Sequence, residues 1–187
     1  MKNTDTGFVS TQDLLGLPED AFDRELVRGR IRERPGLRDR RTGRTLARIS
    51  YLICNWLDQQ PQPHGEALLR APLIRLRRNP DTTIAPDVAH IPAELARRLP
   101  EDAYLIDEVP SLVVEVVSQL DDIPELSEKV IDCLGTGVKL VWVADARVSA
   151  ITAYRADADP IVLHRDDTLI GESALPGFQV PMRVVFG

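Results

Sequence analysis

The sequence lacks the features of several common protein classes. Only two of its 187 residues are cysteine, Cys54 and Cys133, and neither belongs to a Cys-x-x-Cys pair, which excludes a disulfide framework and a cysteine-rich zinc site. No run approaches the roughly 18 apolar residues of a membrane span, and residues 1–20 contain no continuous apolar segment of the kind a secretion signal needs. We therefore expect a soluble, cytoplasmic protein that does not insert into membranes.

Positive charge is concentrated in one part of the chain. The formal net charge is −6, yet residues 24–48 carry ten arginines and three acidic residues, a net +7 that leaves −13 for the rest. Such asymmetry favours a local surface for anions, including a phosphate backbone, on an otherwise acidic body. A solvated ribbon or a contact between subunits has the same charge pattern, so both interpretations stay open.

The order of the predicted elements indicates one mixed α/β domain over residues 1–187. Periodicity and turn residues predict a short helix after Ser10, a β-hairpin over 24–35, an amphipathic helix over 42–60, strand-like segments at 66–76, 82–91, 111–118 and 138–145, and a helix over 121–137. The unit 111–143 has the strand–helix–strand order of a parallel crossover. Within its helix, Leu126, Val130, Ile131 and Leu134 are expected to face the core.

A carboxylate lies in the middle of the most apolar strand. Residues 111–118 read SLVVEVVS, and burial of Glu115 there costs several kcal/mol unless a proton, a cation or a metal compensates the charge. The nearest upstream acidic residue in a strand-like segment is Asp87, in IAPDVAHI. If the two carboxylates lie side by side, a hard divalent cation such as Mg²⁺ or Mn²⁺ relieves their repulsion and can activate water against a phosphodiester.

Other residues are candidates for the same site. The nearest downstream cation, Lys129, can orient or help deprotonate the attacking water and stabilise the transition state. A lysine at position 117 would share the face of Glu115, but that residue is Val117. The backbone carbonyl of Val116 is a further candidate metal ligand, and Glu25 a further carboxylate.

Each candidate also has a purely structural interpretation. An arginine can neutralise Glu115, and Asp87 can cap the turn after the proline that precedes it. Lys129 can be a solvated helix residue beside two glutamates, and Glu25 can pair with Arg28 across a turn. Sequence alone does not decide between these interpretations and a shared site.

Seven segments, in order, carry a resemblance to a known family: ELVRGRI, PDVAHI, PSLVVEVVS, EKVIDCLGTGVKLVWVAD, TAYR, DDTLIG and LPGF. With them the chain resembles the Uma family of the PD-(D/E)XK nuclease superfamily. The resemblance implies a restriction-endonuclease-like mixed sheet flanked by helices, with an N-terminal helix and hairpin, and a metal-dependent phosphodiesterase site. It also implies that Asp87 is the proline-aspartate element, Glu115 the second acidic element, Lys129 the replacement for the lysine of E-x-K, and Glu25 the early glutamate.

Two functions follow from this interpretation. The first is a Mg²⁺- or Mn²⁺-dependent endonuclease that cleaves DNA in an active site formed by Asp87, Glu115, Lys129 and Glu25. The second is a catalytically inactive nuclease-fold module for nucleic-acid binding or assembly, favoured by Val117 and by the net negative charge. A homodimer is expected in either case, because homodimers are the commonest assembly and cleavage of both strands favours two sites.

Overall fold

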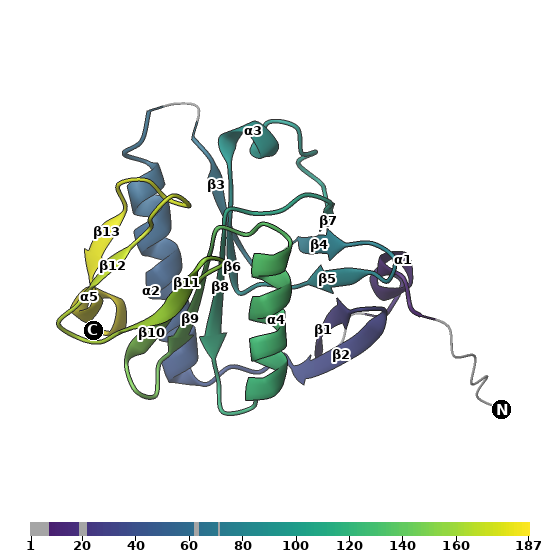
Figure 1. Cartoon of the computed structure of the whole chain (residues 1–187), viewed down its shortest axis with the longest axis horizontal. Coiled ribbons are helices and arrows are strands. Elements are labelled where there is room, and N and C mark those ends of the chain that lie inside the picture. Colours follow the sequence, from purple (N-terminus) through teal and green to yellow (C-terminus); the bar gives the residue numbers. More distant parts are fainter. Residues whose placement is uncertain (1–7, 19–21, 62–63, 71) are drawn as a thin grey trace.

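The strands of the protein are divided between two main sheets. The computed structural model describes residues 8–18, 22–61, 64–70 and 72–187. In these ranges a five-stranded sheet has the order β2-β1-β5-β4-β7, a six-stranded sheet has the order β11-β10-β9-β8-β6-β3, and β12 and β13 form a small ribbon (Figure 1). The predicted mixed α/β fold is confirmed, with the sheet split in two.

The elements have the following bounds. The helices are α1 (Thr11–Leu15), α2 (Arg40–Leu57), α3 (Ala93–Ala96), α4 (Ile123–Gly135) and α5 (Met182–Phe186). The strands are β1 (Phe22–Val27), β2 (Arg30–Pro35), β3 (Glu66–Leu69), β4 (Leu73–Arg77), β5 (Thr82–Ile84), β6 (Val88–Ile91), β7 (Leu105–Ile106), β8 (Leu112–Val117), β9 (Leu140–Asp145), β10 (Ala150–Arg155), β11 (Ala158–Leu163), β12 (Thr168–Ile170) and β13 (Gln179–Pro181).

Strand β8 is buried along its whole length between two hydrophobic cores. Leu112, Val114 and Val116 belong to the core that includes residues of α2, whereas Val113 belongs to the core that includes residues of α4. Because side chains alternate along a strand, Glu115 shares the face of Val113 and points toward α4. Strands β8 and β9 are parallel and α4 connects them, as the crossover prediction requires.

A short connection carries the chain from the five-stranded sheet to the six-stranded sheet beside the candidate residues. Strand β5 pairs with β1 and β4 in the five-stranded sheet, while β6 pairs with β3 and β8 in the six-stranded sheet. Residues 85–87, including Asp87, join β5 to β6 (Figure 1). Asp87 therefore lies where the two sheets meet, and the β1–β2 hairpin reaches the same junction through the pairing of β1 with β5.

The helix after the central strand agrees with the prediction at Val130 and Leu134, which pack in the core, but differs from it at Ile131. Asp122 caps its N-terminus by accepting a hydrogen bond from the backbone N–H of Glu125 at 2.9 Å. The prediction that Ile131 faces the core is wrong, because its side chain is 63% exposed. Lys129 and Asp132 are buried instead, so two charged residues lie on the inner face of α4.

No described helix combines the length and apolar character needed to cross a membrane.

Candidate active site

Asp87 and Glu115 are neighbours across two adjacent strands. In the antiparallel register of β6 and β8, Val88 lies opposite Val114, so the next residues along, Asp87 and Glu115, lie opposite each other. The two side chains are 1% and 2% exposed. The backbone N–H of Val116 donates to Asp87 Oδ2 at 2.8 Å, which fixes one oxygen of that carboxylate. Cross-strand neighbours of like charge repel each other, so this pair needs compensating cations.

Lys129 supplies one of those cations from helix α4. Its Nζ lies 2.6 Å from Glu115 Oε1 and 2.5 Å from Glu25 Oε1. Glu25, on β1, also accepts a hydrogen bond from the backbone N–H of Ala85 at 2.8 Å. The structure thus brings the four predicted site residues together. Lys129 is buried rather than solvated, and Glu25 pairs with it rather than with Arg28, whose guanidinium contacts Asp132 instead.

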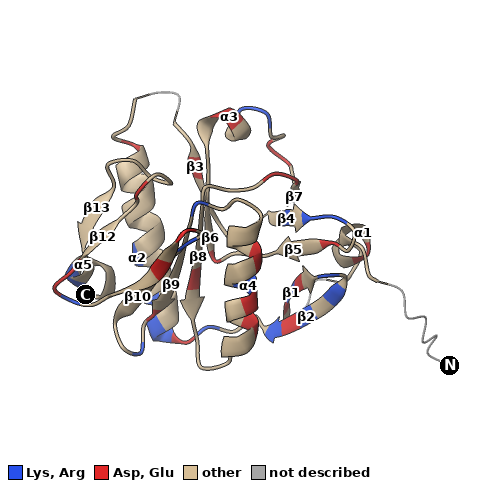
Figure 2. Ribbon diagram, viewed as in Figure 1, with Lys and Arg blue, Asp and Glu red and all other residues tan. Residues whose placement is uncertain are grey.

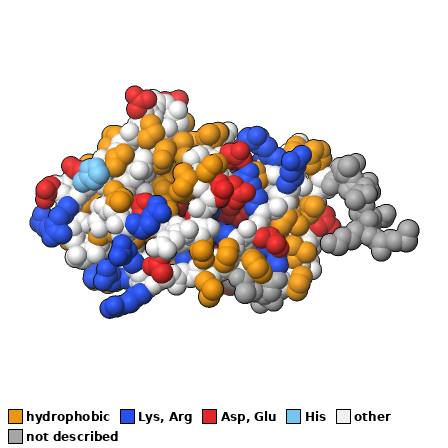
Figure 3. Space-filling model, turned by 90° about the horizontal axis from the view of Figure 1, so that it is seen from below, with side chains coloured by type: hydrophobic (Ala, Val, Ile, Leu, Met, Phe, Trp, Pro, Cys, Tyr) orange, Lys and Arg blue, Asp and Glu red, His pale blue; other side chains and the backbone are white. Residues whose placement is uncertain are grey.

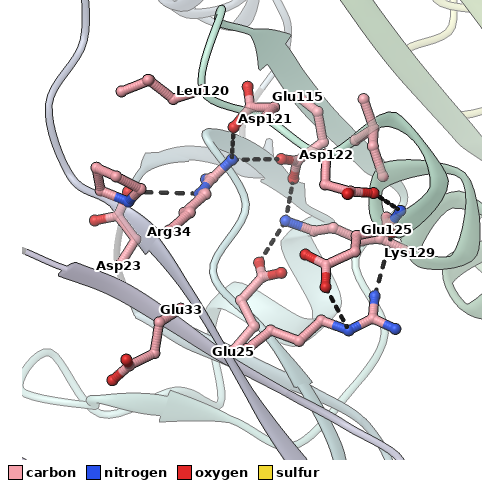
Figure 4. A pocket seen from close by; sticks show the side chains of 13 residues that line it. Asp23, Glu25, Glu33, Arg34, Glu115, Leu120, Asp121, Asp122, Glu125 and Lys129 are labelled. Atoms are coloured by element: carbon pink, nitrogen blue, oxygen red, sulfur yellow. Dashed lines mark hydrogen bonds and ion pairs between the residues drawn. The ribbon is translucent and has the colours of Figure 1, made fainter.

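Arg34, on β2, is a second cation in the site and was not identified from the sequence. Its guanidinium lies 3.7 Å from Glu115 Oε2 and 3.5 Å from Asp121 Oδ1 (Figure 4). The same guanidinium lies 3.6 Å from Asp87 Oδ1. Ten arginines crowd residues 24–48, and nothing in the local pattern separates Arg34 from the others. The pairing of β1 with β2 is the signal that could have found it, because it places Arg34 opposite Asp23, two residues before Glu25.

The site opens into a pocket between the β1–β2 hairpin and the N-terminal part of α4. Glu25, Glu115 and Lys129 line it, together with Arg34 and Asp121 (Figure 4). The hairpin is held to the helix by ion pairs of Arg32 with two glutamates of α4 and of Arg28 with Asp132, where basic and acidic stretches of the two elements adjoin (Figure 2).

Burial and charge shift the ionisation of these groups in different directions. Desolvation raises the pKa of Glu115 to about 7, although the ammonium of Lys129 acts to lower it. Burial alone would lower the pKa of Lys129, but the carboxylates of Glu115 and Glu25 outweigh it and raise that pKa. Burial alone would also lower the pKa of Arg34, but the negative charges of Glu115 and Asp87 more than offset the effect of burial and raise that pKa. Both cations therefore stay protonated near neutral pH.

The oxygens of the Asp87 and Glu115 carboxylates suit a hard divalent cation. Glu115 Oε1 and Oε2 and Asp87 Oδ1 are buried and receive no hydrogen bond from any described group, so only ion pairs compensate them. Mg²⁺ prefers one or two carboxylates completed by waters and other oxygens. No set of three or more His, Cys, Asp or Glu side chains within the described ranges has the arrangement of a metal cluster. The residues present therefore fit a cation held by two carboxylates and completed by backbone or water oxygens, rather than one held by three or more side chains.

Fold and site together define a nuclease-like α/β protein. Residues 11–183 match the model of the Uma2 family, described as "Putative restriction endonuclease", and the chain belongs to that family. The solved structure of "a putative nuclease belonging to DUF820 from Anabaena variabilis ATCC 29413" is similar over 95% of this chain and 97% of that chain, with a TM-score of 0.81 and 18% identity. No curated protein matches the chain. The family resemblance expected from the seven sequence segments is confirmed.

Proposed function

We propose that this protein is a Mg²⁺- or Mn²⁺-dependent endonuclease that hydrolyses DNA phosphodiester bonds. The observation that carries the proposal is the pair of buried carboxylates, Asp87 and Glu115, which lie opposite each other at the junction of two sheets with three oxygens that accept no hydrogen bond. Keeping such a pair in a protein core is costly, and a divalent ligand accounts for it. The family and the fold support the same class of reaction.

The proposed ligands are Asp87, Glu115 and the backbone carbonyl of Val116. The N–H of Val116 points to Asp87, and the N–H and C=O of an extended residue point to the same side of a strand, so the carbonyl also lies on the Asp87 side of β8. A divalent cation held by these oxygens would neutralise charge on the phosphodiester and promote ionisation of the attacking water.

Lys129 is proposed to act as a cation rather than as a base. Its raised pKa keeps the ammonium charged, and charge fixed in a buried site stabilises the negative charge that develops on a phosphate. Glu25 is proposed as a positioning residue. It holds Nζ of Lys129 at 2.5 Å and is itself oriented by the N–H of Ala85 at 2.8 Å.

DNA is proposed as the substrate because a basic surface adjoins the pocket. We define this surface by Arg41 and Arg44 of α2 and Arg147 of the β9–β10 turn, which line one hollow. All three side chains are exposed, and Arg41 and Arg44 form no ion pair with any described carboxylate. Figure 3 shows one group of Lys and Arg side chains toward the lower left of the face seen from below and another toward its upper right. The hydrogen bond and charge of Asp145 are the main cause of the raised pKa of Arg147, and the field of Asp121, which lines the pocket, adds a smaller contribution. The basic surface is therefore within reach of the charges of the site.

The proposal is tested by incubating purified protein with supercoiled plasmid and Mg²⁺ or Mn²⁺. Wild type should nick the plasmid, and Asp87→Asn should not. Asp107→Asn is the matched control, because Asp107 is also an ion-paired aspartate but contacts Arg75 far from the pocket. If wild type does not cut with either metal, or if Asp87→Asn cuts as well as wild type, the enzyme proposal fails.

The inactive module predicts salt-dependent DNA binding without nicking in the same preparation. The homodimer stays a prediction, which size-exclusion chromatography with light scattering tests directly.

A further inference from the structure

Arg34 reaches both proposed metal ligands. Within the described part of the chain, it is the cationic side chain that lies within 4.0 Å of Asp87 and Glu115 at once: one terminal nitrogen is 3.6 Å from Asp87 Oδ1 and the other 3.7 Å from Glu115 Oε2. Lys129 contacts Glu115 on its other oxygen, Oε1. The oxygens that Arg34 faces, Asp87 Oδ1 and Glu115 Oε2, are among those that receive no hydrogen bond.

The contacts of Arg34 are long and are shared among several carboxylates. Its distances to Asp23, Asp87, Glu115 and Asp121 range from 3.5 to 3.7 Å, whereas a charge-assisted hydrogen bond measures about 2.7–2.9 Å. The neighbouring arginines, Arg38 and Arg70, have a closer partner in Asp23, at 3.0 and 2.6 Å. Arg38 lies as near to Asp87 Oδ1 as Arg34 does, at 3.6 Å, and Arg70 lies at 3.9 Å, but neither forms an ion pair with Glu115. Arg34 therefore compensates charge without being fixed to one partner.

We propose that Arg34 is the built-in counter-ion of the metal-free site. Its guanidinium compensates the negative charges of Asp87 and Glu115 until a divalent cation displaces it. Because the cation must displace the guanidinium, Arg34 weakens the affinity of the site for that cation. Asp121 and Asp23 remain as partners for the displaced guanidinium, because each already lies within 3.6 Å of it. This inference rests on the proposed function, since it assumes that these two carboxylates hold the metal.

The test is the affinity for Mn²⁺, measured by isothermal titration calorimetry without DNA. Arg34→Met keeps the apolar stem and removes the charge, and it should bind Mn²⁺ roughly tenfold or more tightly than wild type, because one cation close to both ligands is lost. Arg32→Met is the matched control. Arg32 lies two residues earlier on the same strand, its side chain is 23% exposed against 21% for Arg34, and it pairs with Glu125 and Glu128. Its removal should change the Mn²⁺ affinity by less than about threefold.

Each outcome decides the proposal. The proposal is supported if Arg34→Met binds Mn²⁺ more tightly while Arg32→Met does not, and if adding Glu115→Gln to Arg34→Met abolishes the gain in affinity. Equal gains in Arg34→Met and Arg32→Met reduce the effect to net charge and overturn it, as does an unchanged or weaker affinity in Arg34→Met. The proposed function survives these last results, whereas absence of Mn²⁺ binding in wild type and variants overturns the metal site together with the counter-ion. Should Arg34→Met fail to fold by circular dichroism, Arg34→Gln replaces it with the same expected direction.

Discussion

Strands β6 and β8 carry a polar pair at each end, and the two pairs differ in charge and in surroundings. At one end Asp87 faces Glu115 beside an open pocket. At the other end His90 Nδ1 lies 2.6 Å from Ser111 Oγ, and the N–H of Ser111 donates to the carbonyl oxygen of His90 at 3.0 Å. Both pairs are buried. Burial of polar groups is therefore common to both ends of the strand pair and does not by itself mark a functional site.

The difference lies in what compensates each pair. Burial lowers the pKa of His90 to about 4, with smaller contributions from His64 and Lys139, so the imidazole is neutral near neutral pH and a single hydroxyl satisfies its Nδ1. Asp87 and Glu115 instead require cations from β2 and α4. His90 Nε2 also has no hydrogen-bond partner among the described groups, so the two ends differ in charge and not in the presence of unsatisfied atoms. A neutral pair is the pattern of a structural contact, whereas two carboxylates beside a pocket are the pattern of a ligand site.

Glu115→Gln should separate the two ends most strongly. We expect plasmid nicking to fall by roughly 10³-fold, because the amide removes one of the proposed metal ligands while preserving shape. His90→Gln should nick at the wild-type rate. The measurement is single-turnover cleavage with Mn²⁺ after circular dichroism has confirmed folding. A similar loss of cleavage in His90→Gln would show that the two ends do not differ in function.

Lys129→Met should have the next largest effect, a loss of roughly 10²-fold in cleavage rate, because a fixed cation is removed from the phosphate site. Val117 shares the strand face of Glu115, so a lysine there can present its amine to the same pocket. The double variant Lys129→Met with Val117→Lys should recover part of the rate. Recovery would show that the reaction needs an amine near Glu115. Equal cleavage rates for the single variant Lys129→Met and the double variant would contradict that role.

The His90–Ser111 end should affect the pH dependence of the free energy of unfolding. The folded-state pKa of about 4 lies below that of an unfolded histidine, so the unfolded chain binds a proton first and stability is lost as pH falls. Between about pH 7 and about pH 5 this loss amounts to about 2 kcal/mol. Urea unfolding at the two pH values should show that His90→Gln loses less stability than wild type by that amount. An equal loss would place the acid sensitivity elsewhere.

The smallest effect is expected outside both ends, on the basic surface. Replacing Arg41 and Arg44 together by alanine should reduce the slope of log affinity against log salt by about 2, if each contacts one phosphate. Fluorescence anisotropy with a duplex oligonucleotide measures the slope, using the Glu115→Gln background to prevent cleavage. Replacing Arg78 and Arg97, which are ion-paired and distant from the pocket, should leave the slope unchanged.

The sequence was most informative about the central strand and the helix that follows it. The apolar run around Glu115 and the crossover after it were predictable, because a buried parallel strand needs a continuous apolar segment and a covering helix. Asp87 was identified as a companion because it is the nearest upstream acidic residue in a strand-like segment. The register that places the two residues opposite each other required the structure.

Lys129 and Glu25 were candidates from the sequence, but their pairing with each other and the place of Arg34 could not be predicted. Periodicity favoured Ile131 as an inner residue of α4, but Lys129 and Asp132 are buried because their partners come from the β1–β2 hairpin, 104 residues away in the chain for both pairs. No local pattern encodes contacts at that separation. Arg34 was missed for the same reason, since its role depends on four carboxylates contributed by three separate segments.

The location of the hairpin has a consequence for the order in which the molecule is made. Glu25 and Arg34 leave the ribosome early, whereas Glu115 and Lys129 follow about one hundred residues later. Until helix α4 has been synthesised and packed, the early charges lack their partners and the proposed site is not assembled. If the proposed function holds, a nascent or truncated chain should leave nucleic acid intact.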